Sequence, residues 1–513
     1  MRRYVLFLAI ALVLGSSTAC AEPAAGIIEA GDLVILNGRL FDGTGAPPIV
    51  DGLVAVRGER IIAVGPREDF AVPDGVQVID AGGGFIMPGV IDSHVHVLDT
   101  AFLGIDVLTP WLQGGVTTVR DLFTCGTCVP ELRSSIASVA PDPPRVVIAG
   151  PGFSAPGGLR EGAVVSTVEE ARAAVANLLD NEGADLIKLY DPEMPLEINQ
   201  AIVEEAHARG KRVASHPDGL VNAVAAGVDD VSHPPNGDVS DEVLQQAAAQ
   251  GIEMNTTLIG GPDPVLARYR DLGGVIAMGT DTPFAAGCGM PVYEMRNMVA
   301  SGLTTNEVLV ASTKNAAVVS NLAMELGTLE VGKSADIIIV DGDPLADISA
   351  MENVSLVMKG GRLVDLTSRP TYNEFAFAEP INALPFEGTA SFYCADREEG
   401  EPAASCVSAE SPRTSTVWYR FAPETDGLIL VDLSRPLPLE LPSVTDAVGV
   451  YTGTALDSLT EVACGSGEVT FSADADTTYY LQVYGYTSTA DIFASSSGLV
   501  HLESMSPKVE ESP

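Results

Sequence analysis

The feature that most limits the fold of this chain is a series of eight short strand-like segments separated by helix-like stretches. The segments begin at Gly89, Gly115, Arg145, Asp185, Arg212, Gly227, Ile252 and Val275. Amphipathic stretches that start at Thr167 and Pro195 have the spacing of helices between such strands. Strands that alternate with helices favour parallel βα units. Eight units predict an α/β fold, a (β/α)8 TIM barrel over residues 87–326.

Strand-rich sequence lies on both sides of this region. Residues 32–86 and residues 327–366 both alternate apolar stretches with Gly and Asp turns. We expect the two segments to combine into one small flanking β-subdomain. Further along, a Pro-containing linker at 367–388 leads to residues 389–503, where Ser, Thr, Tyr, Val and Gly dominate without helical periodicity. This composition predicts an all-β sandwich, and residues 504–513 are expected to form a disordered tail.

The N-terminus, residues 1–21, has the pattern of a secretory signal peptide: two arginines, an apolar run and a stretch of small residues. The apolar run is shorter than the ~20 residues of a membrane-spanning helix, so no transmembrane segment is expected. Ala19-Cys20-Ala21 fits a signal peptidase site, while Cys20 could instead carry a lipid anchor, and both alternatives stay open. Either way we expect an exported protein that is periplasmic, anchored to the outer membrane or extracellular.

Charge and cysteine content limit the possible partners and disulfides of the protein. Asp and Glu number 69 against 28 Lys and Arg, a formal net charge of -41 that argues against nucleic acid as a partner. Three of the six cysteines after Cys20 lie in the central region and three near the C-terminus: Cys125, Cys128, Cys288, Cys394, Cys406 and Cys464. Either one disulfide joins the regions or each region keeps a free thiol. For the CxxC pair at 125 and 128 we expect a loop disulfide, because no second CxxC accompanies it.

Polar residues close several of the strand-like segments, at the ends where the catalytic groups of a barrel lie. The first segment ends in His94-Val95-His96, and side chains alternate along a strand, so both imidazoles face the same side. Four of the six histidines in the chain lie at such ends, which chance placement would not produce. Imidazole nitrogens and carboxylate oxygens are suitable zinc ligands. The pattern therefore predicts a metal site built from His94, His96, Lys188, His216, His233 and Asp281.

These residues lie in the segments PGVIDSHVHV, GVTTVRDL, DLIKLY, ASHPDG, AAGVDDVSH and GTDT. Through them residues 32–366 resemble the amidohydrolase superfamily, and the match is closest to its imidazolonepropionase-like and prolidase-like branch. The resemblance implies two zinc ions, one held by His94, His96 and Asp281 and the other by His216 and His233. It also implies that a carbamylated Lys188 bridges the ions. Related members with a single ion leave the number of ions open.

The C-terminal segments TVWYRFAP, DAVGVYTGTALDSLTEVACG and TTYYLQVYG resemble the bacterial pre-peptidase C-terminal domain. Such modules are associated with exported hydrolases, where they aid secretion or surface attachment. No catalytic cluster is visible in this copy, so a passive or adhesive role is expected.

The amidohydrolase resemblance implies hydrolysis of a carbon–nitrogen bond, other than a peptide bond, in a small linear or cyclic amide. Metal ions lower the pKa of bound water from 15.7 to about 7, and the metal-bound hydroxide attacks the carbonyl carbon. Asp281 takes the proton and passes it to the leaving nitrogen, as general base and then acid. Tyr190 faces the same side of its strand as Lys188 and is expected to bind the substrate carbonyl or else to be a wall residue. Arg120 is expected to bind a substrate carboxylate or, as the pattern favours, to form a structural ion pair.

Two other functions fit parts of the sequence. A metallo-dipeptidase of the prolidase-like type would need Arg120 or another base at the barrel mouth to hold the C-terminal carboxylate of a dipeptide. A non-catalytic binding protein would keep the barrel as a relic and act through its sandwich, but the intact ligand set argues against it. The expected partner is therefore a small-molecule amide or a dipeptide.

Overall fold

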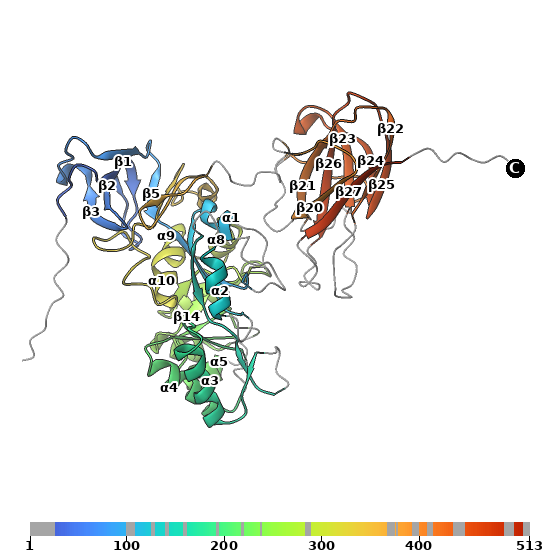
Figure 1. The fold of residues 1–513 in the computed structure, drawn as a ribbon. Coiled ribbons are helices and arrows are strands. Elements are labelled where there is room, and N and C mark those ends of the chain that lie inside the picture. Colours follow the sequence, from blue (N-terminus) through green and yellow to red (C-terminus); the bar gives the residue numbers. More distant parts are fainter. Residues whose placement is uncertain are drawn as a thin grey trace, which may run out of the picture.

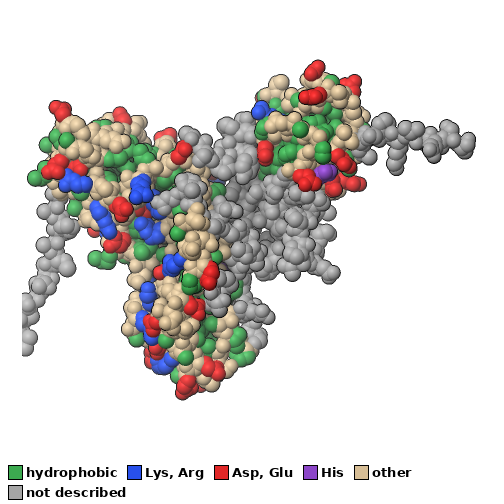
Figure 2. Space-filling view, in the orientation of Figure 1, with side chains coloured by type: hydrophobic (Ala, Val, Ile, Leu, Met, Phe, Trp, Pro, Cys, Tyr) green, Lys and Arg blue, Asp and Glu red, His purple; other side chains and the backbone are tan. Residues whose placement is uncertain are grey.

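The computed structural model describes most of the chain in three parts (Figure 1). The described residues are 26–98, 108–124, 129–138, 143–156, 162–190, 194–216, 220–235, 237, 239–282, 289–366, 375, 378–391, 400–407, 414–433, 447–486 and 497–505. Outside them lie the predicted signal peptide, the anchor position Cys20, and Cys125, Cys128, Cys288 and Cys394. Ten of the 22 residues of the predicted linker and eight of the ten residues of the predicted tail also lie outside. On the face that Figure 2 shows, acidic side chains lie on all three parts.

The two strand-rich flanks share one eight-stranded sheet. Its order is β18-β17-β16-β5-β1-β2-β3, with β4 paired to β1. The strands are β1 Leu33–Leu40, β2 Ile49–Arg57, β3 Arg60–Pro66, β4 Gln77–Asp80, β5 Phe85–Pro88, β16 Ile337–Val340, β17 Val354–Lys359 and β18 Arg362–Leu363. β16 returns from the far end of the catalytic region and runs antiparallel to β5, with Ile338 opposite Met87. The sheet therefore ties together segments about 250 positions apart.

Each of the eight strand-like segments of the central region contains a parallel strand. Three of them form one sheet: β6 Val90–Val95, β7 Val116–Asp121 and β8 Arg145–Ile148. The other five lie in a second sheet: β11 Ile187–Leu189, β12 Val213–Ser215, β13 Asp230–Val231, β14 Glu253–Asn255 and β15 Val275–Ala277. Two short strands, β9 Phe153–Ser154 and β10 Ala163–Val164, extend that second sheet next to β11.

Helices follow most of these strands and cover them with apolar faces. They are α1 Leu108–Gly114, α2 Val129–Ile136, α3 Val168–Asp180, α4 Leu196–His207, α5 Leu220–Ala226, α6 Asp241–Ala249, α7 Val265–Asp271, α8 Val292–Ala300, α9 Thr305–Val310 and α10 Ala316–Val319. α3 begins where Thr167 Oγ1 accepts the N–H of Glu170 at 3.1 Å, an N-cap. Its residues Ala171, Val175 and Leu178 are buried at helical spacing.

The predicted single closed barrel is not detected, because the described strands form two parallel sheets. Individual backbone hydrogen bonds connect them: Ser93 N–H donates to Met278 O at 3.1 Å, and Asp185 N–H donates to Ile148 O at 2.8 Å. At the first junction the ladder is reduced to an isolated bridge between Val95 and Thr282. Asp281 next to that bridge has a φ of 60°, a left-handed conformation that an extended strand cannot contain.

The C-terminal part is a sandwich of two antiparallel-rich sheets. One has the order β19-β21-β26-β23-β24 and the other β20-β27-β22-β25. The strands are β19 Glu379–Ile381, β20 Phe386–Ser391, β21 Thr414–Phe421, β22 Gly427–Asp432, β23 Ala447–Thr452, β24 Thr460–Ser466, β25 Glu468–Ala473, β26 Tyr479–Tyr486 and β27 Ser497–Met505. β19 and the start of β20 lie inside the predicted linker, and β27 extends two residues into the predicted tail. Buried side chains from both sheets, such as Val417, Val448, Val431 and Leu502, form one core.

One disulfide is present among the described cysteines. It joins Cys406 to Cys464, whose Cα atoms are 5.7 Å apart, so both half-cystines belong to the sandwich. These two residues therefore do not bridge the sandwich to the central region. In the described ranges, no helix is both long and apolar enough to cross a membrane.

Candidate metal centre

Three residues from opposite ends of the central region converge at one point. His94 and His96 lie at the end of β6, and Asp281 follows β15. The two Nε2 atoms are 3.2 Å apart. Asp281 Oδ1 lies 3.2 Å from Nε2 of His94 and 2.9 Å from Nε2 of His96. The N–H of Asp281 donates to the carbonyl oxygen of His94 at 2.7 Å, which holds the carboxylate beside both rings.

The hydrogen bonding of His94 shows that this donor set fits a cation. His94 Nδ1 lies 2.8 Å from the carbonyl oxygen of Ser232, which can only accept, so Nδ1 carries the hydrogen and Nε2 carries a lone pair. Burial lowers the pKa of His94 to about 3, so this ring is neutral. The lone pair of His94 Nε2 therefore faces the carboxylate oxygen of Asp281 at 3.2 Å, beside Nε2 of His96, and two imidazole nitrogens with a carboxylate oxygen are a donor set that suits zinc. His94, His96 and Asp281 thus form a metal site.

A second histidine pair lies next to this group. His216 follows β12 and His233 follows β13, and their ring centroids are 4.9 Å apart. The His233 ring is 4.7 Å from that of His94, and its Nδ1 is 3.7 Å from Oδ2 of Asp281. The structure therefore brings all four predicted histidines and Asp281 into one continuous cluster. Among the described residues, one group of three places all of its ligand atoms within 4.8 Å of one another: His94, His96 and Asp281.

Lys188, on β11, is completely buried beside the cluster. Its Nζ donates to the hydroxyl of Ser232, the residue whose carbonyl oxygen accepts from His94. The same Nζ lies 5.2 Å from the centre of the Tyr190 ring. Its positive charge is among the causes that lower the pKa of His94, after burial and against the pull of Asp281. An unmodified ammonium in this place therefore opposes cation binding.

Tyr190 lies at the edge of the cluster, on the same side as Lys188. Its ring is roughly parallel to that of His216 at 6.2 Å and meets Phe123 edge-on at 5.4 Å. The strand-like backbone of Gly152 passes so close that an added Cβ would lie 1.7 Å from a Tyr190 ring carbon, so this neighbour must be glycine. At this position Tyr190 could form part of the wall of the site or contact a substrate carbonyl, so the structure is compatible with both predicted roles.

Arg120 is fully buried in an ion pair, so its predicted contact with a substrate carboxylate needs correction. Its side chain is fully buried and makes a bidentate ion pair with Asp230, with Nη1–Oδ1 at 3.1 Å and Nη2–Oδ2 at 2.8 Å. Nε donates to the carbonyl oxygen of Ser93 at 2.5 Å and Nη1 to that of Val319 at 2.9 Å. Arg120 therefore forms a structural ion pair with Asp230. This is the alternative that the sequence pattern favoured.

Sequence reasoning missed the residues that hold the ligands in place. Asp92 accepts from the N–H and the hydroxyl of Thr280 at 3.0 and 2.8 Å, which ties β6 to the segment that carries Asp281. Asp121 accepts the N–H groups of Val97 and Leu98 at 2.7 and 2.9 Å, just after His96. The spacing of Asp92, two residues before His94 on the same strand, was the available signal, because it placed a third polar side chain on that inward face.

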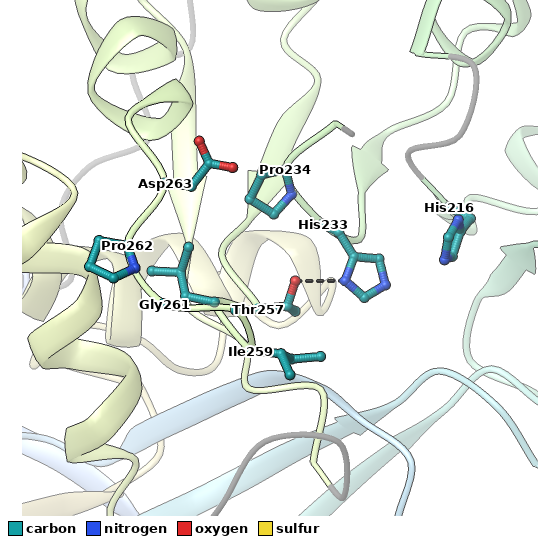
Figure 3. Close-up of a pocket in the computed structure, with 10 residues that line it drawn as sticks. His216, His233, Pro234, Thr257, Ile259, Gly261, Pro262 and Asp263 are labelled. Atoms are coloured by element: carbon teal, nitrogen blue, oxygen red, sulfur yellow. Dashed lines mark hydrogen bonds between the residues drawn. The ribbon is translucent and has the colours of Figure 1, made fainter. Parts of the chain in front are cut away.

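A cavity of about 400 Å³ adjoins the second histidine pair (Figure 3). Ten residues line it: His216, His233, Pro234, Thr257, Leu258, Ile259, Gly260, Gly261, Pro262 and Asp263. In Figure 3 the two histidines lie on one side and Pro262 and Asp263 on the other. Asp263 is the single carboxylate of the lining, and none of these ten residues is Lys or Arg. The cavity therefore connects the cluster to a space of the size that small-molecule ligands occupy.

Comparison with known proteins places this architecture in a family. The Amidohydrolase family model matches residues 85–364, more than half of the chain. The chain is 28% identical to the imidazolonepropionase of Symbiobacterium thermophilum over 420 residues, which cover 66% of this chain and 96% of that protein. It is 25% identical to the enamidase of Eubacterium barkeri over 380 residues, or 65% of this chain and 95% of that one.

Solved structures agree on the fold. A Xaa-Pro dipeptidase with bound methionine matches with a TM-score of 0.57 and 24% identity, over 65% of this chain and all of that chain (100%). Family membership implies a TIM-barrel fold with a β-subdomain, and the family match ends at residue 364, before the sandwich. Given this match and the His-His-Asp group at the strand ends, the chain belongs to the amidohydrolase family of metal-dependent hydrolases that act on carbon–nitrogen bonds.

Proposed function

We propose that this chain is an exported amidohydrolase that holds two zinc ions and hydrolyses a carbon–nitrogen bond, other than a peptide bond, in a small amide. The observation that carries the proposal is the convergence of His94, His96 and Asp281, whose electron pairs face one another and lie beside His216 and His233. The first three residues would hold one ion and the other two histidines would hold the second. Zinc, when bound, supplies a Lewis acid and a water of lowered pKa.

Lys188 would contribute as a carbamate. The ammonium would lose a proton, and addition of CO2 to the neutral amine would then form an N–C bond and release a second proton, which leaves one negative charge shared by two oxygens near the ring of His94 and the hydroxyl of Ser232. That hydroxyl now accepts from Nζ, but a hydroxyl can also donate, so it would stabilise the carbamate equally well. The modification would thus turn the group that now opposes cations into the bridge between the two sites.

Asp281 and Tyr190 would handle the substrate. Asp281 is buried at the centre of the cluster, so its carboxylate is positioned to take a proton from water and return it to the leaving nitrogen. The Tyr190 hydroxyl would donate to the carbonyl oxygen as negative charge develops there. Phe123, edge-on to Tyr190, would help to exclude bulk water from that side.

The lining of the cavity favours an uncharged amide over an acid. Pro234, Leu258, Ile259 and Pro262 supply apolar surface, and Asp263 would repel a carboxylate. A prolidase-like dipeptidase, the second candidate, needs a cationic group for the C-terminal carboxylate of its substrate. Arg120 is committed to Asp230, so that group would have to come from outside the described lining. The fold shared with the Xaa-Pro dipeptidase keeps dipeptides in the experimental panel.

Two further points belong to this proposal. The two parallel sheets are proposed to be the arcs of one (β/α)8 barrel, supported by the hydrogen bonds between Ser93 and Met278 and between Asp185 and Ile148.

Export is proposed because the Cys406–Cys464 disulfide suits an oxidising compartment, as does the signal-like N-terminus. Mass spectrometry of the mature N-terminus would distinguish cleavage from a lipid on Cys20, and an intact Met1 would contradict export.

The function is tested by zinc analysis together with a substrate panel. Purified protein is expected to hold two zinc ions per chain and to turn over neutral linear or cyclic amides. Cyclic imides, N-acyl amino acids and dipeptides complete the panel. Turnover confined to dipeptides would support the dipeptidase instead. Less than one zinc per chain under zinc-replete conditions, with no turnover of any compound, would contradict both enzymes.

A further inference from the structure

A buried carboxylate on α8 lies behind the cluster without belonging to it. Glu294 is 1% exposed, and both of its carboxylate oxygens lie 3.0 Å from the backbone N of Leu258. Burial raises the pKa of Glu294 to about 8, and the charges of Asp92 and Asp281 add to that effect. The hydroxyl of Thr256 and the N–H of Leu258 act in the opposite direction. A buried carboxyl group held by neutral donors is costly to maintain, which indicates a specific task.

The segment that Glu294 holds is strained. Thr257, directly before Leu258, has a φ of 42°, a region that a β-branched residue rarely adopts. Its N–H donates to the carbonyl oxygen of Gly279 at 2.8 Å, two residues before Asp281. Thr257 is therefore held between α8, through the N–H of Leu258, and the segment that carries Asp281. Strain of this kind persists only where the surroundings impose it, and it concentrates at functional sites.

The strained residue contacts a ligand candidate. Thr257 Oγ1 lies 2.6 Å from Nδ1 of His233, the bond drawn in Figure 3. The same hydroxyl donates to the carbonyl oxygen of Ser232 at 3.4 Å, so towards His233 it acts as acceptor. With the hydrogen on Nδ1, the lone pair of His233 is on Nε2, ready for a metal ion. The hydroxyl thus sets both the tautomer and the orientation of this ring.

We propose that Glu294 is a positioning residue for the second ion: through the N–H of Leu258 it keeps Thr257 in its left-handed conformation, and the Thr257 hydroxyl then orients His233. The same contact positions one wall of the cavity, since Thr257, Leu258 and Ile259 line it. This inference rests on the proposed two-ion function. His233 is not on α8, so the proposal connects this helix, through Leu258 and Thr257, to a metal ligand that follows β13.

Glu294→Gln tests the proposal without opening a cavity, because the side chains have the same shape. Above its raised pKa Glu294 offers two acceptor oxygens to the N–H of Leu258, and in the variant the amide NH2 would replace one of them, so the zinc affinities are compared at pH 9. We expect the variant to bind the weaker of its two zinc ions about 10- to 100-fold less tightly, as loss of an outer contact to a ligand typically does. Thr257→Val should lower the affinity similarly, whereas Thr257→Ser, which keeps the hydroxyl, should bind zinc like the parent. The double variant Glu294→Gln/Thr257→Val should be no worse than Thr257→Val alone, because both changes act through one path.

The measurements are zinc content after dialysis against a chelator of known affinity and the visible spectrum of the cobalt-loaded protein. Glu307→Gln is the matched control: Glu307 also accepts a backbone N–H, that of Thr304 at 2.7 Å, but it caps α9. If Glu294→Gln keeps both ions at parent affinity and only unfolds at a lower temperature, the carboxylate is structural and the proposal is overturned. If Glu294→Gln does not fold, the zinc affinities of Thr257→Val and Thr257→Ser decide, and equal values overturn it. A parent chain that binds no zinc would instead refute the proposed function.

Discussion

His94 and Ser232 are joined by a hydrogen bond of 2.8 Å from the ring Nδ1 to the carbonyl oxygen, across 138 positions of sequence. The bond leaves the Nε2 lone pair of His94 facing His96 and Asp281. Ser232 also accepts from Lys188 through its hydroxyl, so one residue at the end of β13 contacts both a histidine ligand and the proposed bridge. The predictions below follow from such shared contacts.

Replacing Lys188 by Ala should remove the bridge between the two ions. Without the carbamate, the His216–His233 pair has lost its link to the first site, so we expect zinc content to fall from two ions to one per chain. The catalytic efficiency kcat/KM should fall by on the order of 100-fold or more, the cost of losing a main electrostatic group in an active site. Zinc analysis and carbon-13 NMR after labelling with bicarbonate check this. Lys333→Ala, remote from the cluster, serves as control, and two ions in Lys188→Ala would contradict the bridge.

Replacing Arg120 by Met should destabilise the chain without changing substrate binding. The buried ion pair with Asp230 loses one partner, which leaves an uncompensated charge and costs about 3–5 kcal/mol of unfolding free energy. The double variant Arg120→Met/Asp230→Leu should recover part of that loss. Urea unfolding in a Trp418→Phe background would report on the central region through Trp111, the other tryptophan of the chain. Unchanged stability together with a raised KM would restore the substrate-binding role of Arg120.

Replacing Tyr190 by Phe should lower kcat/KM by on the order of 100-fold, the typical cost of removing one donor to a developing oxyanion. Zinc content should not change, because the ring and its contacts with His216 and Phe123 remain. Steady-state kinetics with zinc analysis provide the check, and Phe123→Leu controls for loss of aromatic packing. Parent-like kinetics would show that Tyr190 is a wall residue.

The metal-free chain should lose stability as pH rises, in part through Glu294. Burial raises the folded-state pKa of this carboxyl from 4.5 to about 8, so the folded chain binds its proton more tightly than the unfolded chain does. The stabilisation is complete below pH 4.5 and is lost as pH rises towards 8, with a slope of at most about 1.4 kcal/mol per pH unit. Unfolding free energies of the parent and of Glu294→Gln between pH 5 and pH 9 measure it.

The comparison with Glu294→Gln removes one titrating group. Burial also raises the pKa of Asp92, to about 7. Asp92 is present in both chains, so the difference between them contains the titration of Glu294 together with its coupling to Asp92. The parent should therefore lose more stability than the variant over this range. Parallel pH profiles would show that Glu294 is ionised in the folded chain.

Local patterns predicted much of this architecture. The eight strand-like segments each contain a parallel strand, and α3 begins at Thr167, because period and capping depend on neighbouring residues only. Tertiary contacts explain the differences. The ladder between β6 and the segment after β15 is interrupted where Asp281 is left-handed, and β19 forms inside the predicted linker, where β21 provides a partner. Neither event has a local signal.

The types of ligand and the shared face of His94 and His96 follow from the residue order alone, because alternation along one strand is a property of consecutive residues. The ion pair of Arg120 with Asp230, and the contacts of Glu294 with Leu258 and of Thr257 with His233, depend on how the folded chain packs. Such pairings depend on which strand ends and helices lie side by side after the chain has packed. A buried charge is costly without a partner, because it has lost its contacts with water. Its partner is therefore a group that the folded chain places within hydrogen-bond distance.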